Sequence, residues 1–322
     1  MFLSESKLFL SLQKKRMLIV GGSGLLGYKL LENVENFELY ATYNKNLIQT
    51  KNAEIIKINI TNKKDCHKIL ELKPDIIINT SAMTNVDYCE QFKDEAYDVN
   101  VNGTRNLANI AQHIGCKFIH ISSDAIFSGN NKHLEEDMPN PINTYGKTKL
   151  ESEKIASEVS NYLILRPSVL FGWMPINYIQ TRDKSIKPMN FALWVIRKLF
   201  EKQKLSIVDD QFNTPTLADN LSENIIKMIT KDVHGIFHAT GLSCINRLDF
   251  SRKLAERFGY SNRLISSCSS TELKQIAKRS KQSCLNCDKI IKKGMNLLEI
   301  DQSIKIMYDQ IKKEEPRIIG KT

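Results

Sequence analysis

Two side chains four residues apart, Tyr145 and Lys149, are the pair in this sequence best suited to moving a proton. They follow the turn-forming Asn140-Pro141, and their i, i+4 spacing predicts that both lie on one face of a helix. A free phenol titrates near pH ~10, too high for easy proton exchange at neutrality. Because a neighbouring positive charge favours the phenolate, we expect Lys149 to lower the pKa of Tyr145. An ordinary exposed helix face is the alternative interpretation.

A serine hydroxyl is the third candidate. Ser122 and Ser123 end a short apolar run that is typical of a strand. Open parallel sheets bind ligands beyond the carboxyl ends of their strands, where a hydroxyl can hydrogen-bond a reacting oxygen and stabilise its charge. We expect Ser123 to do so, with Ser122 as the alternative and simple capping of the turn as the other explanation. Ser123, Tyr145 and Lys149 form the predicted catalytic set.

A glycine-rich turn, Gly21-Gly22-Ser23-Gly24-Leu25-Leu26-Gly27, follows the first apolar run and opens a helical segment. Glycine permits a tight turn and the close approach of backbone to a pyrophosphate, which then sits on the N–H groups at the start of the helix. The motif predicts a bound dinucleotide, and the positive charge of an oxidised nicotinamide would further lower the pKa of Tyr145. The turn residues expected to contact the cofactor are Gly21, Ser23, Gly24, Leu25, Leu26 and Gly27.

The segment about 20 residues beyond Gly21 bears on the choice between NAD and NADP. An NAD-selecting fold normally offers an Asp or Glu there, yet this chain reads Ala41-Thr42-Tyr43-Asn44-Lys45. Without that carboxylate a 2′-phosphate is not repelled, and Lys45 can pair with it. We therefore expect NADP, with NAD possible; an ordinary solvated Lys45 is the alternative. Further expected cofactor contacts are Asn44, Asn59, Ile60, Ser81, Ala82, Met83 and Asn100, the last either on a water-held proton path behind Lys149 or at a helix kink.

Short β-branched runs alternate with longer segments of helical period, which predicts an α/β fold, a doubly wound parallel sheet of Rossmann type. We expect strands at 17–21, 38–42, 55–58, 75–79, 117–122 and 162–166, and helices at 25–33, 64–72, 95–114 and 144–159. Later strands at 205–208 and 235–239 and helices at 191–200, 217–229, 248–258 and 300–311 follow. The predicted division is an N-terminal extension (1–16), a dinucleotide-binding domain (17–172, with later sheet elements near 205–239), and a smaller C-terminal substrate-binding lobe (mainly 173–204 and 240–322).

Composition limits the remaining classes of function. Seven cysteines scattered over 322 residues do not resemble a secreted disulfide framework, so we expect a cytoplasmic protein. No apolar run reaches the roughly 20 residues that span a bilayer, which argues against a membrane protein. The net charge of +10 suits an anionic ligand, while dispersed lysines and the lack of nucleic-acid motifs argue against a nucleic-acid partner. No metal site is expected, because Cys284-x-x-Cys287 has no second ligand pair nearby and the six histidines show no metal-ligand spacing. His120 and His238, on expected strands, are interpreted as packed core or sheet residues.

These motifs together resemble the extended short-chain dehydrogenase/reductase family, and within it the dTDP-4-dehydrorhamnose reductase branch of sugar-nucleotide reductases, which also includes the regulatory β subunit of methionine adenosyltransferase. The resemblance runs from about Met17 to Tyr308 and rests on 122–127, 145–149, the string Asp209-Asp210-Gln211-Phe212-Asn213-Thr214-Pro215-Thr216, and 235–238. It implies NAD(P)H as hydride donor and reduction at C4 of a nucleotide-activated 4-keto-6-deoxy sugar, with a homodimer possible. The residues it implies at the substrate are Thr84, Asp124, Arg166, Gln211 and Arg279.

Three departures from the family pattern bear on the substrate. Ala125 stands where relatives usually carry a tyrosine, Asn59 replaces an aspartate at the adenine, and Ser280 replaces a proline. Loss of the ring at Ala125 suggests a different sugar or a weaker catalyst. The alternative function is a cofactor-binding regulatory subunit with little or no turnover. Dehydration of the sugar is disfavoured, because no acidic residue follows Asp124 to help remove water.

Overall fold

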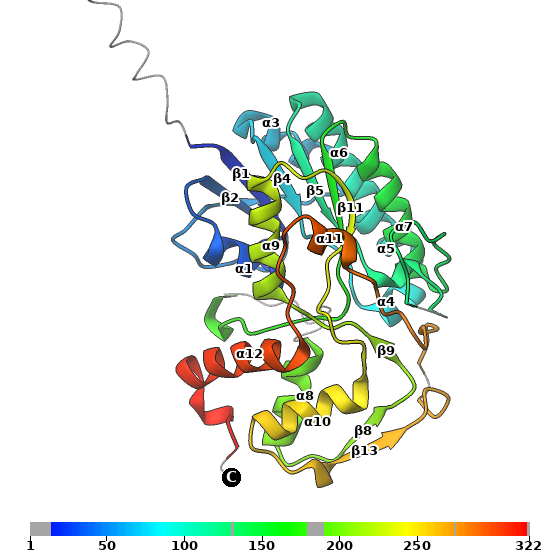
Figure 1. The fold of residues 1–322 in the computed structure, drawn as a ribbon. Helices are drawn as coiled ribbons and strands as arrows, with labels where there is room; N and C mark the ends of the chain where they lie inside the picture. Colours follow the sequence, from blue (N-terminus) through cyan, green and yellow to red (C-terminus); the bar gives the residue numbers. More distant parts are fainter. Residues whose placement is uncertain (1–13, 130–131, 179–189, 274, 321–322) are drawn as a thin grey trace, which may run out of the picture.

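The computed structural model describes residues 14–129, 132–178, 190–273 and 275–320 (Figure 1). Its centre is a parallel sheet of seven strands in the order β3-β2-β1-β4-β5-β6-β11. The α/β doubly wound fold predicted from the alternating pattern is thereby confirmed. The strands are β1 (Arg16–Val20), β2 (Glu38–Tyr43), β3 (Glu54–Lys57), β4 (Ile76–Asn79), β5 (Lys117–Ile121), β6 (Tyr162–Arg166) and β11 (Gly235–His238).

Both faces of the sheet are covered, which explains why the central strands β1 and β4 contain uninterrupted apolar runs. In β1, Met17 and Ile19 pack into the core on one face, while Leu18 and Val20 pack into the core on the other, and each is at most 1% exposed. Burying each such side chain contributes about 1.5–3 kcal/mol. The first core is closed by α1 (Leu25–Asn33), α9 (Ala218–Thr230) and α11 (Asp288–Lys292), the second by α3 (Lys68–Leu72), α6 (Gly103–Ile114) and α7 (Thr144–Ser157).

A smaller lobe lies beyond the carboxyl edge of the sheet (Figure 1). It has its own apolar core and consists of α8 (Phe191–Phe200), α10 (Arg247–Arg257), α12 (Ile300–Glu314) and the strand pair β8 (Leu205–Val208) and β13 (Ile265–Cys268). The expectation that the strand at 205–208 belongs with the main sheet is wrong. The free edge of β6 is taken by β11, whereas Leu205 and Ile207 of β8 pack into the lobe core.

The remaining elements are short. They are α2 (Lys63–Cys66), α4 (Val86–Gln91), α5 (Lys93–Tyr97), a π-helical turn at Asp98–Asn102, 3₁₀ turns at Asp124–Ile126, Ile176–Tyr178, Asn262–Leu264 and Pro316–Ile318, and the strand pairs β7 (Leu170–Phe171) with β10 (Thr216–Leu217) and β9 (Phe212–Asn213) with β12 (Ile245–Asn246). The helices expected at 64–72 and 95–114 are therefore each interrupted, the first between α2 and α3 and the second by the π-helical turn. The expected extension falls largely outside the described residues, as does 179–189 of the expected lobe.

A disulfide joins Cys244, just before β12, to Cys284. Spacing along the chain gave no sign of it, because the two residues are 40 positions apart and meet only after the lobe has folded. Five cysteines are free, namely Cys66, Cys89, Cys116, Cys268 and Cys287. Within the described residues no helix is both long enough and apolar enough to cross a membrane.

Candidate active site

A cleft of about 1330 Å³ lies between the carboxyl edge of the sheet and the smaller lobe. One end is lined by the glycine-rich turn, 21–27, and by 42–46 after β2. The middle is lined by 80–88 after β4 and by 121–125 after β5. The lobe contributes Asn213, Arg247 and Arg279 to the opposite wall. A ligand in this cleft would therefore contact both parts of the molecule.

The glycine-rich turn leaves no room for a side chain at Gly21 or at Gly27. Gly21 has a φ of +88°, and a Cβ there would come within 2.8 Å of the backbone nitrogen of Ser81. A Cβ on Gly27 would lie 2.5 Å from the carbonyl oxygen of Gly21. Gly24 is the N-cap of α1 and provides no side-chain acceptor, and the first helical turn holds no acidic residue. The N–H groups at this helix start are thus available to a phosphate, which fits a pyrophosphate.

The three predicted catalytic residues converge on the cleft. Tyr145 and Lys149 lie on α7, which the Asn143 side chain caps through the backbone N–H of Gly146 at 2.8 Å. Gly146 is required at this point, since a Cβ there would lie 2.1 Å from the carbonyl oxygen of Ala125. This close packing brings the start of α7 against the loop after β5, where the Ser123 side chain lies near enough to the Tyr145 hydroxyl to lower the pKa of the phenol. Ser123 rather than Ser122 makes this contact, whereas the Ser122 hydroxyl is buried and has no partner among the described residues.

Burial controls the proton affinities of this set. It raises the pKa of Tyr145 above its ordinary value, and the carboxylate of Asp124 adds to the rise, while the nearby Ser123 side chain opposes it. Lys149 is 1% exposed, and burial lowers its pKa to about 8, opposed by Glu153. The expectation that Lys149 lowers the pKa of Tyr145 is not met in the chain alone. The Lys149 ammonium instead donates to the carbonyl of Ile121 at 2.7 Å and lies 3.2 Å from Nε2 of His120.

Asp124 is a hub between the sheet and the lobe. Its Oδ1 accepts a hydrogen bond from Ser123 at 3.0 Å. Its Oδ2 accepts from Ser168 at 2.6 Å, from Ser283 at 2.8 Å and from Asn213 at 3.3 Å. Both oxygens are therefore engaged within the protein, and the carboxylate holds Ser123 in place beside Tyr145.

The sequence-based candidates divide between the cleft and the interior. Arg166 was expected at the substrate, but it is 3% exposed and forms a bidentate ion pair with Glu153 at 2.8 and 2.9 Å, behind the cleft wall. Asn100 was expected at the cofactor, but it is 1% exposed and holds the backbone of Met83 and the hydroxyl of Thr148. The remaining candidates line the cleft: Gly21, Ser23, Gly24, Leu25, Leu26, Gly27, Asn44, Lys45, Asn59, Ile60, Ser81, Ala82, Met83, Thr84, Ser123, Asp124, Tyr145, Lys149, Gln211 and Arg279.

Several residues of the site were not anticipated. Arg247, at the start of α10, lies over the ring of Phe191 at 4.6 Å, and among the described residues it forms no ion pair. Burial lowers its pKa to about 10, with attraction to Asp124 opposing and repulsion from Arg279 adding to that effect. No sequence motif marks Arg247. Asn213 and Ser283 stand in strings that the sequence reading did single out, but nothing in those strings indicates that they meet at Asp124.

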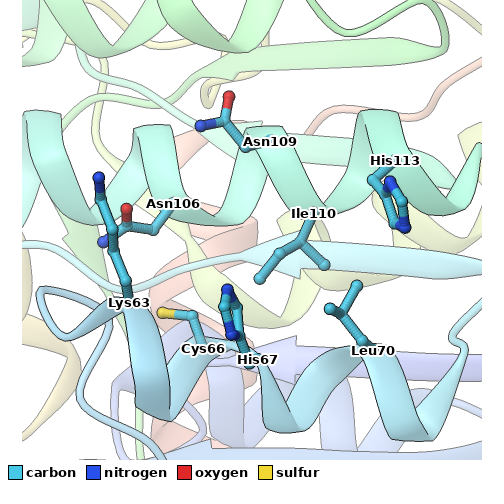
Figure 2. Close-up of a pocket in the computed structure, with 8 residues that line it drawn as sticks. All are labelled: Lys63, Cys66, His67, Leu70, Asn106, Asn109, Ile110 and His113. Carbon is cyan, nitrogen blue, oxygen red and sulfur yellow. The ribbon is translucent and has the colours of Figure 1, made fainter.

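A second, smaller hollow lies away from this cleft, between α2, α3 and α6 (Figure 2). Its lining includes Cys66, His67 and His113. The Cys66 thiol bonds the carbonyl of Ile60 at 3.4 Å, and burial raises its pKa to about 11, so it stays protonated. In the part of the chain that the structure describes, no cluster of three or more histidine, cysteine or acidic side chains could hold a metal ion. The candidate catalytic and cofactor-binding residues therefore belong to the large cleft and not to this hollow.

Comparison with known proteins agrees with this geometry. Residues 15–313 match the model of the RmlD substrate binding domain family. The chain belongs to this family. A dTDP-4-dehydrorhamnose reductase from Aggregatibacter actinomycetemcomitans is 30% identical over 293 residues, covering 85% of this chain and 92% of that protein. The methionine adenosyltransferase 2 subunit beta of Bos taurus is 28% identical over 258 residues, covering 77% and 73%.

Solved structures of the RmlD family place the same fold around a cofactor. The dTDP-4-dehydrorhamnose reductase of Bacillus anthracis, solved in complex with NADP, superposes with a TM-score of 0.81 at 26% identity and covers 92% of this chain and 100% of that one. The family resemblance read from the sequence is confirmed.

Proposed function

We propose that this RmlD-family chain reduces the keto group of a nucleotide-activated 4-keto-6-deoxy sugar, with NADPH as hydride donor and Tyr145 as proton donor. One observation supports this most directly: Ser123 and Tyr145 lie together and face the same cleft as the glycine-rich turn. The names of the relatives point the same way.

The residues of the chain have distinct parts in this proposal. When bound, the cofactor supplies a hydride to the carbonyl carbon. The Tyr145 hydroxyl donates its proton to the carbonyl oxygen. The Ser123 hydroxyl, which donates to Asp124 Oδ1 in the chain alone, turns its hydrogen to the same carbonyl oxygen as charge develops on it. Lys149 restores the proton to Tyr145 and holds the nicotinamide ribose. The N–H groups at the start of α1 hold the pyrophosphate, and Lys45 favours NADP through its 2′-phosphate.

The substrate side of the cleft is supplied mainly by the lobe. Thr84, Gln211 and Arg279 line it, and Arg279 is held by an ion pair with Asp87 at 3.0 Å. A nucleotide-activated sugar carries a diphosphate, which suits the positive charge of this wall. We further propose that the enzyme acts in the cytoplasm, where both NADPH and sugar nucleotides are found, and that it forms a homodimer.

A regulatory subunit with little turnover is the second candidate, supported by the relatives named methionine adenosyltransferase 2 subunit beta and by Ala125. NADPH and NADH oxidation, followed with a panel of dTDP-, UDP-, GDP- and CDP-linked 4-keto sugars, separates the two. Turnover that is lost in Tyr145→Phe while NADPH still binds supports the reductase. Tight NADPH binding with no turnover of any sugar supports the regulatory subunit.

A further inference from the structure

His120 lies directly behind the catalytic lysine, on β5, and is 0% exposed. It is opposite Asn79 of β4 in the sheet register, and it does not line the cleft. Its ring reaches three side chains: Nδ1 lies 3.3 Å from Nδ2 of Asn79, and Nε2 lies 3.0 Å from Oγ of Ser152 and 3.2 Å from Nζ of Lys149. The ring nitrogen that carries the proton determines whether the Lys149 ammonium faces an N–H group or a lone pair at Nε2.

The hydrogen bonds around Asn79 determine whether Nδ1 of His120 donates or accepts. Oδ1 of Asn79 accepts from both the N–H and the hydroxyl of Ser81, at 3.2 and 2.7 Å, so the amide nitrogen must point the other way. One amide hydrogen goes to Thr104, whose own hydroxyl hydrogen is donated to the carbonyl of Asn100 at 2.7 Å. The other amide hydrogen points at Nδ1 of His120. Nδ1 is therefore an acceptor and carries no proton.

The neutral ring then carries its proton on Nε2. The hydroxyl of Ser152 is free to accept it, because Ser152 donates its own hydrogen to the carbonyl of Lys149 at 2.7 Å. A doubly protonated ring is excluded by the Asn79 donor at Nδ1, and burial together with Lys149 holds the pKa of His120 well below its usual range. The Lys149 ammonium thus faces an N–H group and not a lone pair.

We propose that His120, fixed in this tautomer by Asn79, is a positioning residue that sets the proton affinity of Lys149. The proton exchange with Tyr145 rests on the proposed function, whereas the tautomer of His120 and its effect on Lys149 do not. An N–H dipole 3.2 Å from an ammonium opposes the charged form, and among the described residues Ile121 provides the one hydrogen-bond acceptor of that ammonium. Lys149 is thereby suited to exchange a proton with Tyr145 near neutral pH.

The other titratable and charged groups around Lys149 leave this effect in place. Glu153 on α7 favours the ammonium, but both of its oxygens are bound by Arg166 of β6. Tyr145 on α7 is protonated, and Asp124, beyond β5, has both oxygens hydrogen-bonded. None of these replaces the contact with His120.

Two measurements on the substrate-free protein test the proposal. The ¹⁵N shifts of the His120 ring should show a protonated Nε2 and an unprotonated Nδ1; the opposite pattern would overturn it. The titration of Lys149, followed through its ¹³Cε signal, should move upward by about one pH unit in His120→Phe, a tenfold gain in proton affinity. An unchanged pKa in a folded His120→Phe protein would also overturn it.

Ser152→Ala is the matched control, since it removes the other Nε2 partner and leaves the Asn79 contact intact. It should leave the Lys149 pKa unchanged or lower, and a rise equal to that of His120→Phe would mean that any change behind α7 has this effect. If His120→Phe does not fold, the ring shifts of the native protein still decide the tautomer.

A kinetic measurement links the effect of His120 on Lys149 to catalysis. The pH at which kcat falls on the alkaline side should be higher in His120→Phe than in the native protein. Because the NMR measurements need no substrate, failure of the proposed function would leave them interpretable.

Discussion

The Ser283 hydroxyl donates to Asp124 Oδ2 at 2.8 Å, joining the loop after β5 to a segment 159 residues further along the chain. Ser168 and Asn213 reach the same oxygen from two other segments. The loop that carries Ser123 is therefore positioned by residues from the second half of the chain. The position of the Ser123 hydroxyl therefore depends on how the lobe packs against the sheet.

Asp124→Asn tests this relationship. The amide offers one acceptor oxygen where the carboxylate has two, and its NH₂ group would face donors, so we expect a loss of about 1–3 kcal/mol in the free energy of unfolding. Ser123 would lose its fixed position, and kcat should fall more than the affinity for NADPH. Denaturant unfolding and cofactor titration measure the two effects. Ser283→Ala, which removes a single donor, should cost less than Asp124→Asn; equal costs would contradict the role of hub.

The depressed pKa of Lys149 has a consequence for stability. Its folded-state pKa of about 8 lies below the ordinary lysine value of 10.5, so between these values the unfolded chain binds more protons, and stability rises with pH. Below pH 8 the cost of burying the ammonium is fully present, on the order of 3 kcal/mol. Lys149→Met should therefore stabilise the protein at pH 7 while abolishing turnover. Unfolding at pH 7 and at pH 10 checks this, since the gain should shrink at the higher pH.

Lys45→Glu should reverse the cofactor preference. A carboxylate there would repel the 2′-phosphate, and we expect NADPH binding to weaken at least about tenfold relative to NADH. Fluorescence titration of both cofactors gives the ratio. Lys51→Glu changes the charge by the same amount at an exposed position outside the cleft and serves as the control. Tighter binding of NADH than NADPH by the native protein would refute the role given to Lys45.

The two arginines expected at the substrate should behave differently. Arg166→Met leaves Glu153 buried without its partner, and we expect a loss of about 3–5 kcal/mol in stability. Arg279→Met removes a cleft residue that is partly exposed, so it should mainly raise KM for the sugar nucleotide. Thermal unfolding and steady-state kinetics on both variants provide the comparison. A large KM effect with unchanged stability in Arg166→Met would restore that residue to the substrate site.

The sequence predicted those features of the fold and the site that depend on residues close together in the chain. The glycine-rich turn, the apolar strands and the Tyr145–Lys149 spacing each depend on a few neighbouring residues, and all appear where expected. Arg166 was misplaced because a strand-end arginine looks the same whether it faces a ligand or a buried Glu153. Arg247 was missed because its place in the cleft depends on contacts made only after the chain has folded. The disulfide between Cys244 and Cys284 escaped notice for the same reason. His120 was expected to pack within the sheet, and it does.

The path of the chain between the two parts limits how the protein can be divided. After β6 it enters the lobe with α8, returns to the sheet with α9 and β11, enters the lobe again with α10, comes back with α11, and finishes in the lobe with α12. A fragment ending at residue 172 would expose one edge of β6 and uncover part of a sheet face. Neither part is a continuous segment of the chain, so we expect sheet and lobe to unfold together.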